Sequence, residues 1–267
     1  MEFDSGTDTL VVRVDDGGIG RLIFDNQVRH NAFSVEMQAA LPAALAWLTD
    51  ADSVRVIVVS GAGDKAFMSG ADVSELGSRP ASTDGGPTRA PSDLPAWGYW
   101  SGVTKPIVAM IGGYCIGAGL LVALRADIRI CSDDSTFAVP AARLGLGYGF
   151  RGVEALVEVA GIGWAAEILF SGRRLSAHEA LSAGLVNRVV TREELEPTVL
   201  DLAESIAGNA PLTLAAIKAG LSQARLDPGR RDLGEVEAMV RLCFESADFV
   251  EGQRAFLEKR RPRFTGR

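Results

Sequence analysis

The sequence predicts an α/β protein with a parallel sheet and a helical C-terminal region. Strands and helices alternate through the first two thirds of the chain, and from Leu195 onward helical patterns recur without strong strand signals. The run VRVIVVSG at residues 54–61 is a continuous β-branched stretch, which is typical of a strand buried on both faces of a parallel sheet. With 267 residues, 47% of them hydrophobic, the chain can bury a substantial core.

The N-terminal part predicts a hairpin followed by a helix. Residues 11–14 alternate between apolar and polar side chains, DDGG at 15–18 is typical of a turn, and 21–24 resume an apolar strand. Ser34 is placed to cap the N-terminus of an amphipathic helix that runs through Leu45.

Residues 106–124, PIVAMIGGYCIGAGLLVAL, form a run of 19 uncharged residues, a length that would suit a membrane helix. Gly112 and Gly113 interrupt the run directly after the β-branched stretch IVAMI. We therefore predict a buried strand, a turn and a buried helix that begins at about Gly117, and we expect no membrane association.

Another strand is predicted at residues 128–133, and the pattern is mainly helical beyond 150. Two capping-box motifs, SAHE at 176–179 and TREE at 191–194, predict helix starts on either side of a strand at 185–190. Helices thus close the predicted chain.

Two segments each leave two interpretations open. Residues 77–93 are dense in Pro, Gly, Ser and Thr, so they form either a lid beside a ligand site or a plain surface insertion. The last nine residues form either a solvated basic end or a local contact for an anion, because five of them are basic: Lys259, Arg260, Arg261, Arg263 and Arg267.

Composition excludes several classes of protein. The net charge of −7 and the pI near 5.0 argue against a nucleic-acid partner. Three cysteines without CxxC spacing predict neither a disulfide framework nor a zinc site. The first residues, MEFDSGTDTL, are acidic where a targeting peptide would be basic, so we expect a cytoplasmic protein.

Side chains suited to catalysis are scarce. The only histidines are His30 and His178, and without a GxSxG motif a Ser-His-Asp triad is not supported. HExxH and comparable metal-ligand spacings are absent, so no metal site is predicted. Neither GxGxxG after the first strand nor GxxxxGK[ST] occurs, which argues against the usual nucleotide cradles.

Backbone groups are the remaining candidates. Two junctions rich in small residues, Gly70-Ala71-Asp72 and Gly117-Ala118-Gly119, each open a predicted helix after a strand. The first N–H groups of a helix have no partner within the helix, so each junction offers hydrogen-bond donors. Two such donors that converge on one oxygen would form an oxyanion hole, whereas the alternative for each junction is simply tight packing.

Six motifs in order along the chain resemble the enoyl-CoA hydratase/isomerase, or crotonase, superfamily. They are NQVRHNAFS, DKAFMSGADVSEL, KPIVAMIGGYCIGAG, FAVPAARLGLGYG, SAHEALSAGLVNRVV and EGQRAFLEKRRPRF. The resemblance implies a spiral of ββα turns over residues 1–195 and a C-terminal helical oligomerisation region over 196–267, within one continuous domain. It also implies an acyl-CoA thioester as substrate and a homotrimer or a dimer of trimers. Coenzyme A enters as part of the substrate, so no separate cofactor is expected.

The resemblance assigns site residues position by position. The family's oxyanion donors fall on the backbone N–H groups of Ala71 and Ala118, which belong to the two junctions already found. Gly70, Asp72 and Gly117 flank these donors, and Asp72 matches a position that more often caps its helix than takes part in chemistry.

The resemblance also implies where coenzyme A binds. Arg29, His30 and Ala32 lie in the segment that matches the lining of its adenine and phosphate end. Phe256 and Lys259 match a C-terminal helix that reaches the same part of the ligand, often from a neighbouring subunit. Lys259 would supply a point charge to a phosphate.

The sequence departs from the family at two positions. Where hydratases carry two glutamates, this chain has Leu121 and Ala141. Hydration needs its water deprotonated and aimed, so a reaction without a base, such as decarboxylation of a malonyl-type thioester, is favoured. Tyr148 matches a tyrosine of methylmalonyl-CoA decarboxylases in the superfamily, and either orients the substrate carboxylate, helps to deliver a proton or merely packs at the rim of the pocket.

Two functions from different classes therefore remain. The first is an enzyme, a CoA-thioester lyase nominally similar to enoyl-CoA hydratase, that stabilises an enolate. The second is a catalytically silent protein that binds or delivers acyl-CoA. Trp97, Tyr99 and Trp100 are candidates either for an acyl pocket or for the core.

Overall fold

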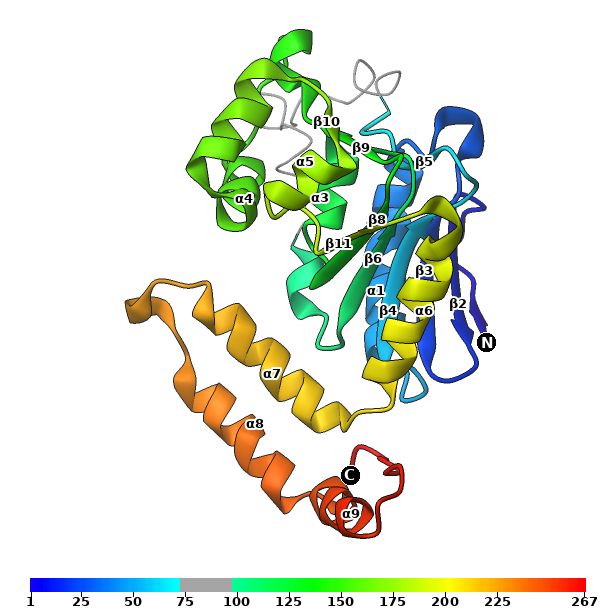
Figure 1. Cartoon of the computed structure of the whole chain (residues 1–267), viewed down its shortest axis with the longest axis vertical. Coiled ribbons are helices and arrows are strands. Elements are labelled where there is room, and N and C mark those ends of the chain that lie inside the picture. Colours follow the sequence, from blue (N-terminus) through cyan, green and yellow to red (C-terminus); the bar gives the residue numbers. More distant parts are fainter. Residues whose placement is uncertain (73–97) are drawn as a thin grey trace.

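The computed structural model describes residues 1–72 and 98–267. It contains a seven-stranded sheet of strand order β1-β2-β3-β4-β6-β8-β11, and a four-stranded sheet of order β10-β9-β7-β5 (Figure 1). The strands of the larger sheet are β1 (Glu2–Phe3), β2 (Leu10–Asp15), β3 (Ile19–Phe24), β4 (Val56–Gly61), β6 (Ile107–Ile111), β8 (Ile128–Ser132) and β11 (Arg188–Val190). The strands of the smaller sheet are β5 (Ala66–Met68), β7 (Tyr114–Ile116), β9 (Thr136–Ala138) and β10 (Leu175–Ser176).

The predicted hairpin is confirmed. Strands β2 and β3 pair antiparallel, with Leu10 opposite Phe24 and Asp15 opposite Ile19. The turn between them contains Gly17 at a φ of 81°, in the left-handed region that favours glycine. From β3 onward the larger sheet is parallel, as expected for an α/β layout.

Strand β4 is buried on both faces, as its β-branched run predicts. Ile57 and Val59 belong to the core on the side of helix α1 (Val35–Asp50). Val56 and Val58 face the opposite side, where helix α6 (Arg192–Ala207) covers the sheet. The centre of the molecule is therefore a parallel sheet with apolar packing on each face.

The predicted helix starts are confirmed at their caps. The Ser34 side chain accepts a hydrogen bond from the Met37 N–H at 3.2 Å and starts α1. Complete capping boxes start α5 (Ala177–Ser182) at Ser176 and α6 at Thr191. Such side-chain oxygens satisfy N–H groups that the helix itself cannot.

The apolar run at 106–124 forms β6, a turn, the short strand β7 and helix α3 (Ala118–Ala123). The strand, the turn and the helix start are as predicted, but β7 was not expected. It forms because the chain reverses at Gly113, whose φ is 69° and where a Cβ would lie 2.0 Å from the Lys65 carbonyl oxygen. In the described ranges, no helix is both long and apolar enough to cross a membrane.

The remaining helices follow α3. Helix α4 (Phe150–Ser171) covers the smaller sheet region and is interrupted at Gly161, where φ is 72° and ψ is 166°. Single 3₁₀ turns occur at η1 (Gln27–Arg29), η4 (Tyr99–Gly102), η5 (Pro140–Leu144) and η6 (Pro228–Arg230). The chain ends with α7 (Pro211–Ala224), α8 (Leu233–Glu245) and α9 (Ala247–Leu257).

Helices α7, α8 and α9 form an arm that extends away from both sheets (Figure 1). The expected division after residue 195 falls inside α6, which packs on the larger sheet, so the arm begins only at Pro211. Polar contacts tie α7 to the body: the Lys218 ammonium pairs with Asp127, and Arg225 pairs with Glu158 on α4. Oligomerisation through this region remains a prediction.

The arm carries much exposed apolar surface. A pocket of about 620 Å³ opens between its three helices, and Ile217, Cys243, Phe244 and Phe249 are among the residues that line it. Several apolar side chains of the arm are more than half exposed: Ile217, Leu221, Leu233, Leu242, Phe244, Val250, Phe256 and Leu257. In contrast to Cys243, Cys115 and Cys131 are buried in the sheets.

Candidate active site

The two junctions predicted to supply backbone donors lie in contact. Strands β5 and β7 are parallel neighbours, so the ends that lead into Gly70 and Gly117 meet at one edge of the smaller sheet. A Cβ on Gly117 would lie 3.8 Å from the Gly70 Cα, and a Cβ on Gly70 would lie 3.4 Å from the Ile116 carbonyl oxygen. Both glycines have positive φ angles, 116° for Gly70 and 55° for Gly117. The bends that start the two segments therefore depend on residues without a side chain.

Next to these glycines, two backbone N–H groups have no hydrogen-bond acceptor within the described residues. Among the hydrogen bonds within residues 1–72 and 98–267, none has the N–H of Ala71 or of Ala118 as its donor. The neighbouring groups are occupied, because the Gly117 N–H donates to the Ala138 carbonyl at 2.7 Å and the Asp72 N–H donates to the Phe33 carbonyl at 3.3 Å. Ala118 is the first residue of α3, where an N–H has no acceptor within the helix. Two donors of this kind at adjoining junctions are suited to one shared oxygen atom.

Close packing fixes the start of α3 against β5. A Cβ on Gly119 would lie 2.3 Å from the Met68 carbonyl oxygen, much closer than a carbon and an oxygen can approach. Gly119 is buried, as are Ala118 and Leu120 on either side of it. The spacing between the two junctions thus depends on the absence of a side chain at Gly119.

Segment 29–33 runs beside the first junction. The Ser69 N–H donates to the His30 carbonyl at 3.0 Å, and the Phe33 N–H donates to the Gly70 carbonyl at 2.7 Å. Phe33 and Ala71 form an isolated parallel bridge. The structure therefore places Arg29, His30 and Ala32 next to Ala71, although they are about 40 residues apart in sequence.

Asn31 holds this segment in place, a role that was not predicted from the sequence. The Asn31 side chain is 1% exposed and donates to the carbonyls of Ala62 at 2.9 Å and Ala66 at 2.7 Å. Its Oδ1 accepts the N–H of Asn26 at 2.9 Å. The backbone φ of Asn31 is 57°, a value that asparagine tolerates better than most residues. This tolerance was the only property of the residue type that pointed to its role.

Asp72 forms an ion pair with Arg29. Both carboxylate oxygens of Asp72 accept hydrogen bonds from Arg29 Nη1, at 2.9 Å and 2.8 Å. The Asp72 side chain is 7% exposed, whereas that of Arg29 is 53% exposed. Asp72 was expected mainly as a helix cap, and its contact with Arg29 was not anticipated. The cation stabilises the ionised form of this carboxylate beside the first junction.

Three of the predicted residues belong to the core that also contains the junctions. Leu121 is 2% exposed on α3, and Ala141 on η5 and Tyr148 pack against the same group of buried side chains as Ala118. Leu121 and Ala141 are therefore apolar and packed.

The Tyr148 hydroxyl is buried without a partner. No hydrogen bond to its oxygen is found within the described part of the chain. The ring packs on α4, since a Cβ on Gly152 would lie 2.7 Å from it. Burial raises the pKa of Tyr148 well above its usual value, and the positive charge of Arg125 offsets only part of that rise. The phenol therefore stays protonated at neutral pH, and its catalytic role remains a prediction.

Phe256 and Lys259 do not join this site within one chain. Helix α9, where Phe256 is 83% exposed, lies at the opposite end of the molecule from α3 (Figure 1). Lys259 follows α9, is exposed and has a φ of 54°. Contact between these residues and a ligand in a neighbouring subunit remains a prediction.

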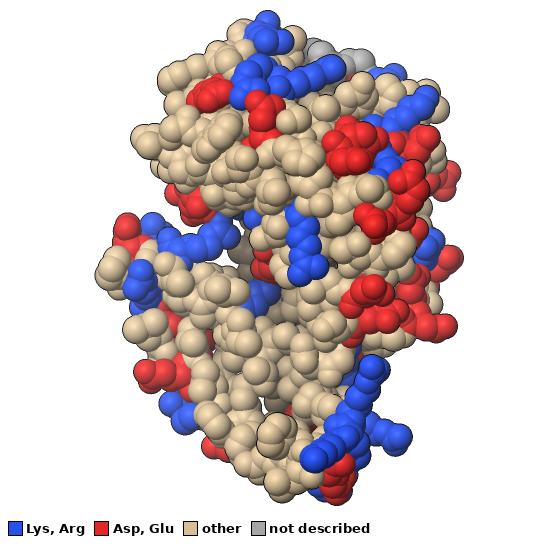
Figure 2. Space-filling view, viewed as in Figure 1, with Lys and Arg blue, Asp and Glu red and all other residues tan. Residues whose placement is uncertain are grey.

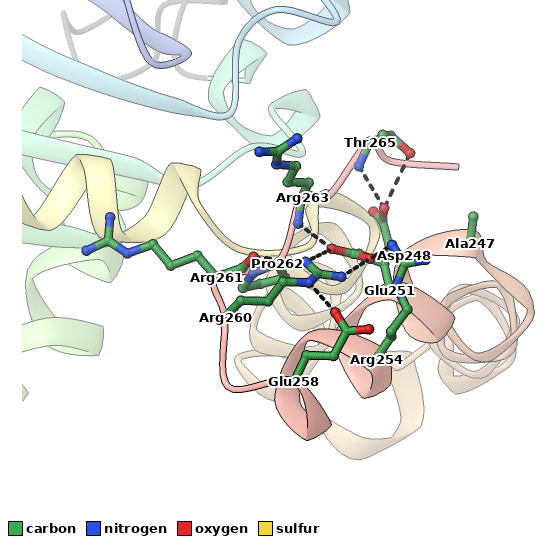
Figure 3. A pocket seen from close by; sticks show the side chains of 10 residues that line it. All are labelled: Ala247, Asp248, Glu251, Arg254, Glu258, Arg260, Arg261, Pro262, Arg263 and Thr265. Carbon is green, nitrogen blue, oxygen red and sulfur yellow. Dashed lines mark hydrogen bonds and ion pairs between the residues drawn. The ribbon is translucent and has the colours of Figure 1, made fainter.

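The basic C-terminal end is partly neutralised by acidic side chains. It lines a pocket of about 710 Å³ that also contains Asp248, Glu251 and Glu258 (Figure 3). Arg260 donates to both oxygens of Glu251, at 2.6 Å and 2.9 Å, and to Glu258 at 2.6 Å. Neither of the two interpretations of the tail applies to Arg260. Its guanidinium is neither freely solvated nor an anion site, because carboxylates neutralise its charge.

Other predicted features lie partly outside the described residues. The 77–93 segment and Trp97 are among them, so the lid and the role of that tryptophan stay open. Trp100 is 4% exposed and belongs to the core, whereas Tyr99 is 45% exposed.

In the two described ranges, no three His, Cys, Asp or Glu side chains gather as a metal site would require. Acidic and basic side chains are interspersed over the face shown in Figure 2.

Comparison with known proteins relates the whole chain to one family. The family model described as enoyl-CoA hydratase/isomerase matches residues 15–267. The carnitinyl-CoA dehydratase of Proteus mirabilis is 35% identical, with 94% of this chain and 96% of that protein covered. The carnitinyl-CoA dehydratase of Salmonella typhi is 33% identical, with coverages of 89% and 91%.

Solved structures give the same result. The enoyl-CoA hydratase/carnithine racemase from Magnetospirillum magneticum matches with a TM-score of 0.89 at 30% identity, covering 98% of this chain and 97% of that one. Pseudomonas aeruginosa DspI matches with a TM-score of 0.85 at 30% identity and covers 97% of both chains. The crotonase fold implied by the six sequence motifs is thus confirmed.

Proposed function

Because the chain belongs to the enoyl-CoA hydratase/isomerase family, we propose that it is an enzyme that binds an acyl-CoA thioester and stabilises the enolate of that thioester. The observation that carries the proposal is the pair of unoccupied N–H groups, on Ala71 and Ala118, at two junctions in contact. The thioester oxygen accepts both hydrogen bonds, and they strengthen as that oxygen becomes negative. One such donor contributes about 3 kcal/mol to transition-state stabilisation when measured by deletion.

The proposed reaction is decarboxylation of a malonyl-type thioester. The bond between the α-carbon and the carboxylate breaks, CO₂ departs, and its electron pair remains as an enolate on the thioester. No base is needed for this step, which fits the apolar residues Leu121 and Ala141 at the two positions where hydratases have glutamates. A proton must then reach the α-carbon to complete the reaction.

Tyr148 supports this assignment. The Tyr148 phenol is buried, stays protonated and has no hydrogen-bond partner in the described residues. It is therefore able to donate a hydrogen bond to a ligand. We assign it to the substrate carboxylate or to the proton transfer that follows loss of CO₂. The other acid close to the junctions, Asp72, is paired with Arg29 and is less suited to act as a base.

A second reaction, dehydration of a 3-hydroxyacyl-CoA, is favoured by the names of the relatives, which are carnitinyl-CoA dehydratases. It would use the same two donors. However, it also requires a base to remove a proton from the α-carbon, and positions 121 and 141 provide none. A silent acyl-CoA binding protein is the remaining alternative.

One experiment separates these functions. The protein is incubated in turn with methylmalonyl-CoA, carnitinyl-CoA and crotonyl-CoA, products are identified by mass spectrometry, and affinity is measured by calorimetry. Formation of propionyl-CoA from methylmalonyl-CoA supports the proposed decarboxylation. Turnover of carnitinyl-CoA or crotonyl-CoA alone would overturn it in favour of dehydration or hydration, and binding without any product would favour the silent protein.

We also propose that the arm mediates assembly into a homotrimer or a dimer of trimers. The exposed apolar side chains of α7, α8 and α9 support this, because soluble monomers rarely expose so many large apolar groups together. In such an assembly Phe256 and Lys259 would reach coenzyme A bound to a neighbour. Light scattering coupled to gel filtration tests the proposal, and a monomer at micromolar concentration would contradict it.

A further inference from the structure

Lys105 lines a third pocket, remote from the two junctions. The pocket has a volume of about 270 Å³ and lies between the C-terminal end of α1, the residues that precede β6, the start of α7 and the C-terminal tail. Thr49 comes from α1 and Asp52 follows it, whereas Pro211 begins α7 and Gly266 belongs to the tail. Nothing in the proposed function uses this pocket.

The Lys105 side chain is anchored by two carbonyl groups. Its Nζ donates to the Leu48 carbonyl at 3.0 Å and to the Ala51 carbonyl at 2.5 Å. Both carbonyls lie at the C-terminal end of α1, where the last carbonyls have no partner within the helix. Among the described residues, no third acceptor binds this nitrogen.

This arrangement can also hold a neutral amine. A neutral amine has two N–H bonds and one lone pair, whereas an ammonium has three N–H bonds and no lone pair. The two carbonyls take up the two hydrogens of the neutral form. In that form the nitrogen lone pair is not engaged by either carbonyl. The side chain that carries it lines an open pocket.

The surrounding charges are compatible with this state. Partial burial and the cation of Arg55 lower the pKa of Lys105 to about 8, against the raising effects of Asp52 and Asp50. Neither aspartate forms an ion pair with Lys105 within the part of the chain that the structure describes.

Two further cations come close to Lys105 from other elements. From α7, Lys218 donates to the Lys105 carbonyl at 2.6 Å and pairs with Asp127 at 3.0 Å. From the C-terminal tail, Arg267 lines the pocket.

We propose that Lys105 is a covalent modification site that takes acyl groups from thioesters. The neutral amine attacks the thioester carbonyl, the C–N bond forms, the C–S bond breaks, and the thiol leaves with the proton that the nitrogen releases. No oxidant, metal or enzyme is required. The acyl donor is any small acyl thioester, and the reaction does not use the N–H groups of Ala71 and Ala118.

The other lysines provide a contrast. The sequence contains only four: Lys65, Lys105, Lys218 and Lys259. Lys65 and Lys259 are exposed to solvent. The pKa of Lys218 is also lowered by burial, but its ammonium is held by the Asp127 carboxylate. Lys105 alone among the four combines a lowered pKa, two matched carbonyl acceptors and no ion pair within the described residues.

Acylation would change the contacts of Lys105. The amide nitrogen keeps one hydrogen, so Lys105 can donate to only one of the two carbonyls, and the Ala51 carbonyl also accepts the Val54 N–H at 2.9 Å. The acylated nitrogen can also no longer be protonated, so the C-terminal end of α1 loses the cation that Lys105 supplies at lower pH. The acyl group would occupy the pocket next to Pro211 and the C-terminal tail, where the arm begins.

The test labels the intact wild-type protein. Acetyl-CoA and the acetyl thioester of N-acetylcysteamine, which lacks the nucleotide, are used in separate reactions from pH 6 to 10, and acetylation of each lysine is followed by peptide mass spectrometry. At pH 8 we expect Lys105 to react at least about tenfold faster than Lys65 and Lys259, because a lysine of ordinary pKa is almost fully protonated there. The rate at Lys105 should rise with a midpoint near pH 8 with both donors.

The same reaction in 8 M urea is the control for the folded environment, and selectivity for Lys105 should disappear there. Selectivity that persists in urea would overturn the proposal. Equal rates at Lys105 and Lys65 in the folded protein, or labelling by acetyl-CoA but not by the truncated thioester, would also overturn it. The latter outcome would assign the reaction to a bound nucleotide. Failure of the proposed decarboxylation would leave this result unaffected.

Discussion

The Met68 carbonyl oxygen lies 2.3 Å from the position that a Cβ on Gly119 would take. Helix α3 therefore approaches β5 as closely as a glycine permits, and this approach sets the distance between Ala118 and Ala71. One methyl group would push the two segments apart.

We expect Gly119→Ala to lower kcat/KM at least about 100-fold, because separation of the junctions removes the effect of one oxyanion donor. Stability should fall by about 1–3 kcal/mol, as for other overpacked cores. Gly102→Ala is the matched control, since nothing lies within 4 Å of its Cβ position. Steady-state kinetics and thermal unfolding measure both effects. Wild-type activity in Gly119→Ala would show that the spacing does not matter.

Tyr148→Phe separates a chemical role from a packing role. The ring and its contact with Gly152 remain, and a buried hydroxyl without a protein partner is lost. The free energy of unfolding should stay within about 1 kcal/mol of wild type or increase. The kcat for decarboxylation should fall at least about tenfold, with acyl-CoA affinity by calorimetry unchanged. An unchanged kcat would leave the hydroxyl without the assigned role.

The Arg29–Asp72 pair is expected to stabilise the segment beside the first junction. Arg29→Ala leaves the buried Asp72 carboxylate without its cation, but Arg29 is half exposed, so water compensates for part of the loss. We expect a destabilisation of about 1–2 kcal/mol in chemical unfolding. In a double-mutant cycle with Asp72→Asn, the second substitution should cost little once the first is present. Additive effects would mean that the two side chains do not stabilise each other.

The contact between α9 and the C-terminal tail should weaken in acid. The Arg260 guanidinium, helped by the Arg263 N–H, lowers the pKa of Glu251 from 4.5 to about 2 (Figure 3). Because the folded pKa lies below the unfolded value, this contribution to stability is present above about pH 4.5 and is lost as the pH falls towards 2.

Hydrogen exchange of residues 247–267 should therefore speed up between pH 4.5 and 2, after correction for intrinsic rates. Glu251→Gln should make the segment exchange faster already at pH 7 and should flatten this pH dependence. Glu258→Gln is the control, because Glu258 accepts from Arg260 Nε only. Equal behaviour of the two variants would argue against Glu251 as the responsible carboxylate.

Much of the larger sheet could be predicted because its signals are local. The buried strand β4, the hairpin of β2 and β3 and the capped helices α1, α5 and α6 each follow from periodicity or from a cap within a few residues. Strands β5, β7 and β9 have three residues each, too few for a period, so the smaller sheet was not foreseen.

The site was predictable only in part. Small residues after apolar strands indicated the junctions, and the family motifs placed the donors on Ala71 and Ala118. The ion pair between Arg29 and Asp72 spans 43 residues, and the amide of Asn31 joins three separate backbone segments. Contacts between residues so far apart have no local pattern in a single sequence.

The unequal burial of the three cysteines makes the arm open to selective labelling. Burial raises the pKa of Cys115, and it raises that of Cys131 to about 12, so neither thiol forms a reactive thiolate at neutral pH. Cys243 is only partly buried, on α8 beside the apolar pocket. A maleimide spin label would thus attach there without any engineered substitution, and in the assembly proposed above its dipolar spectrum would give distances between neighbouring subunits.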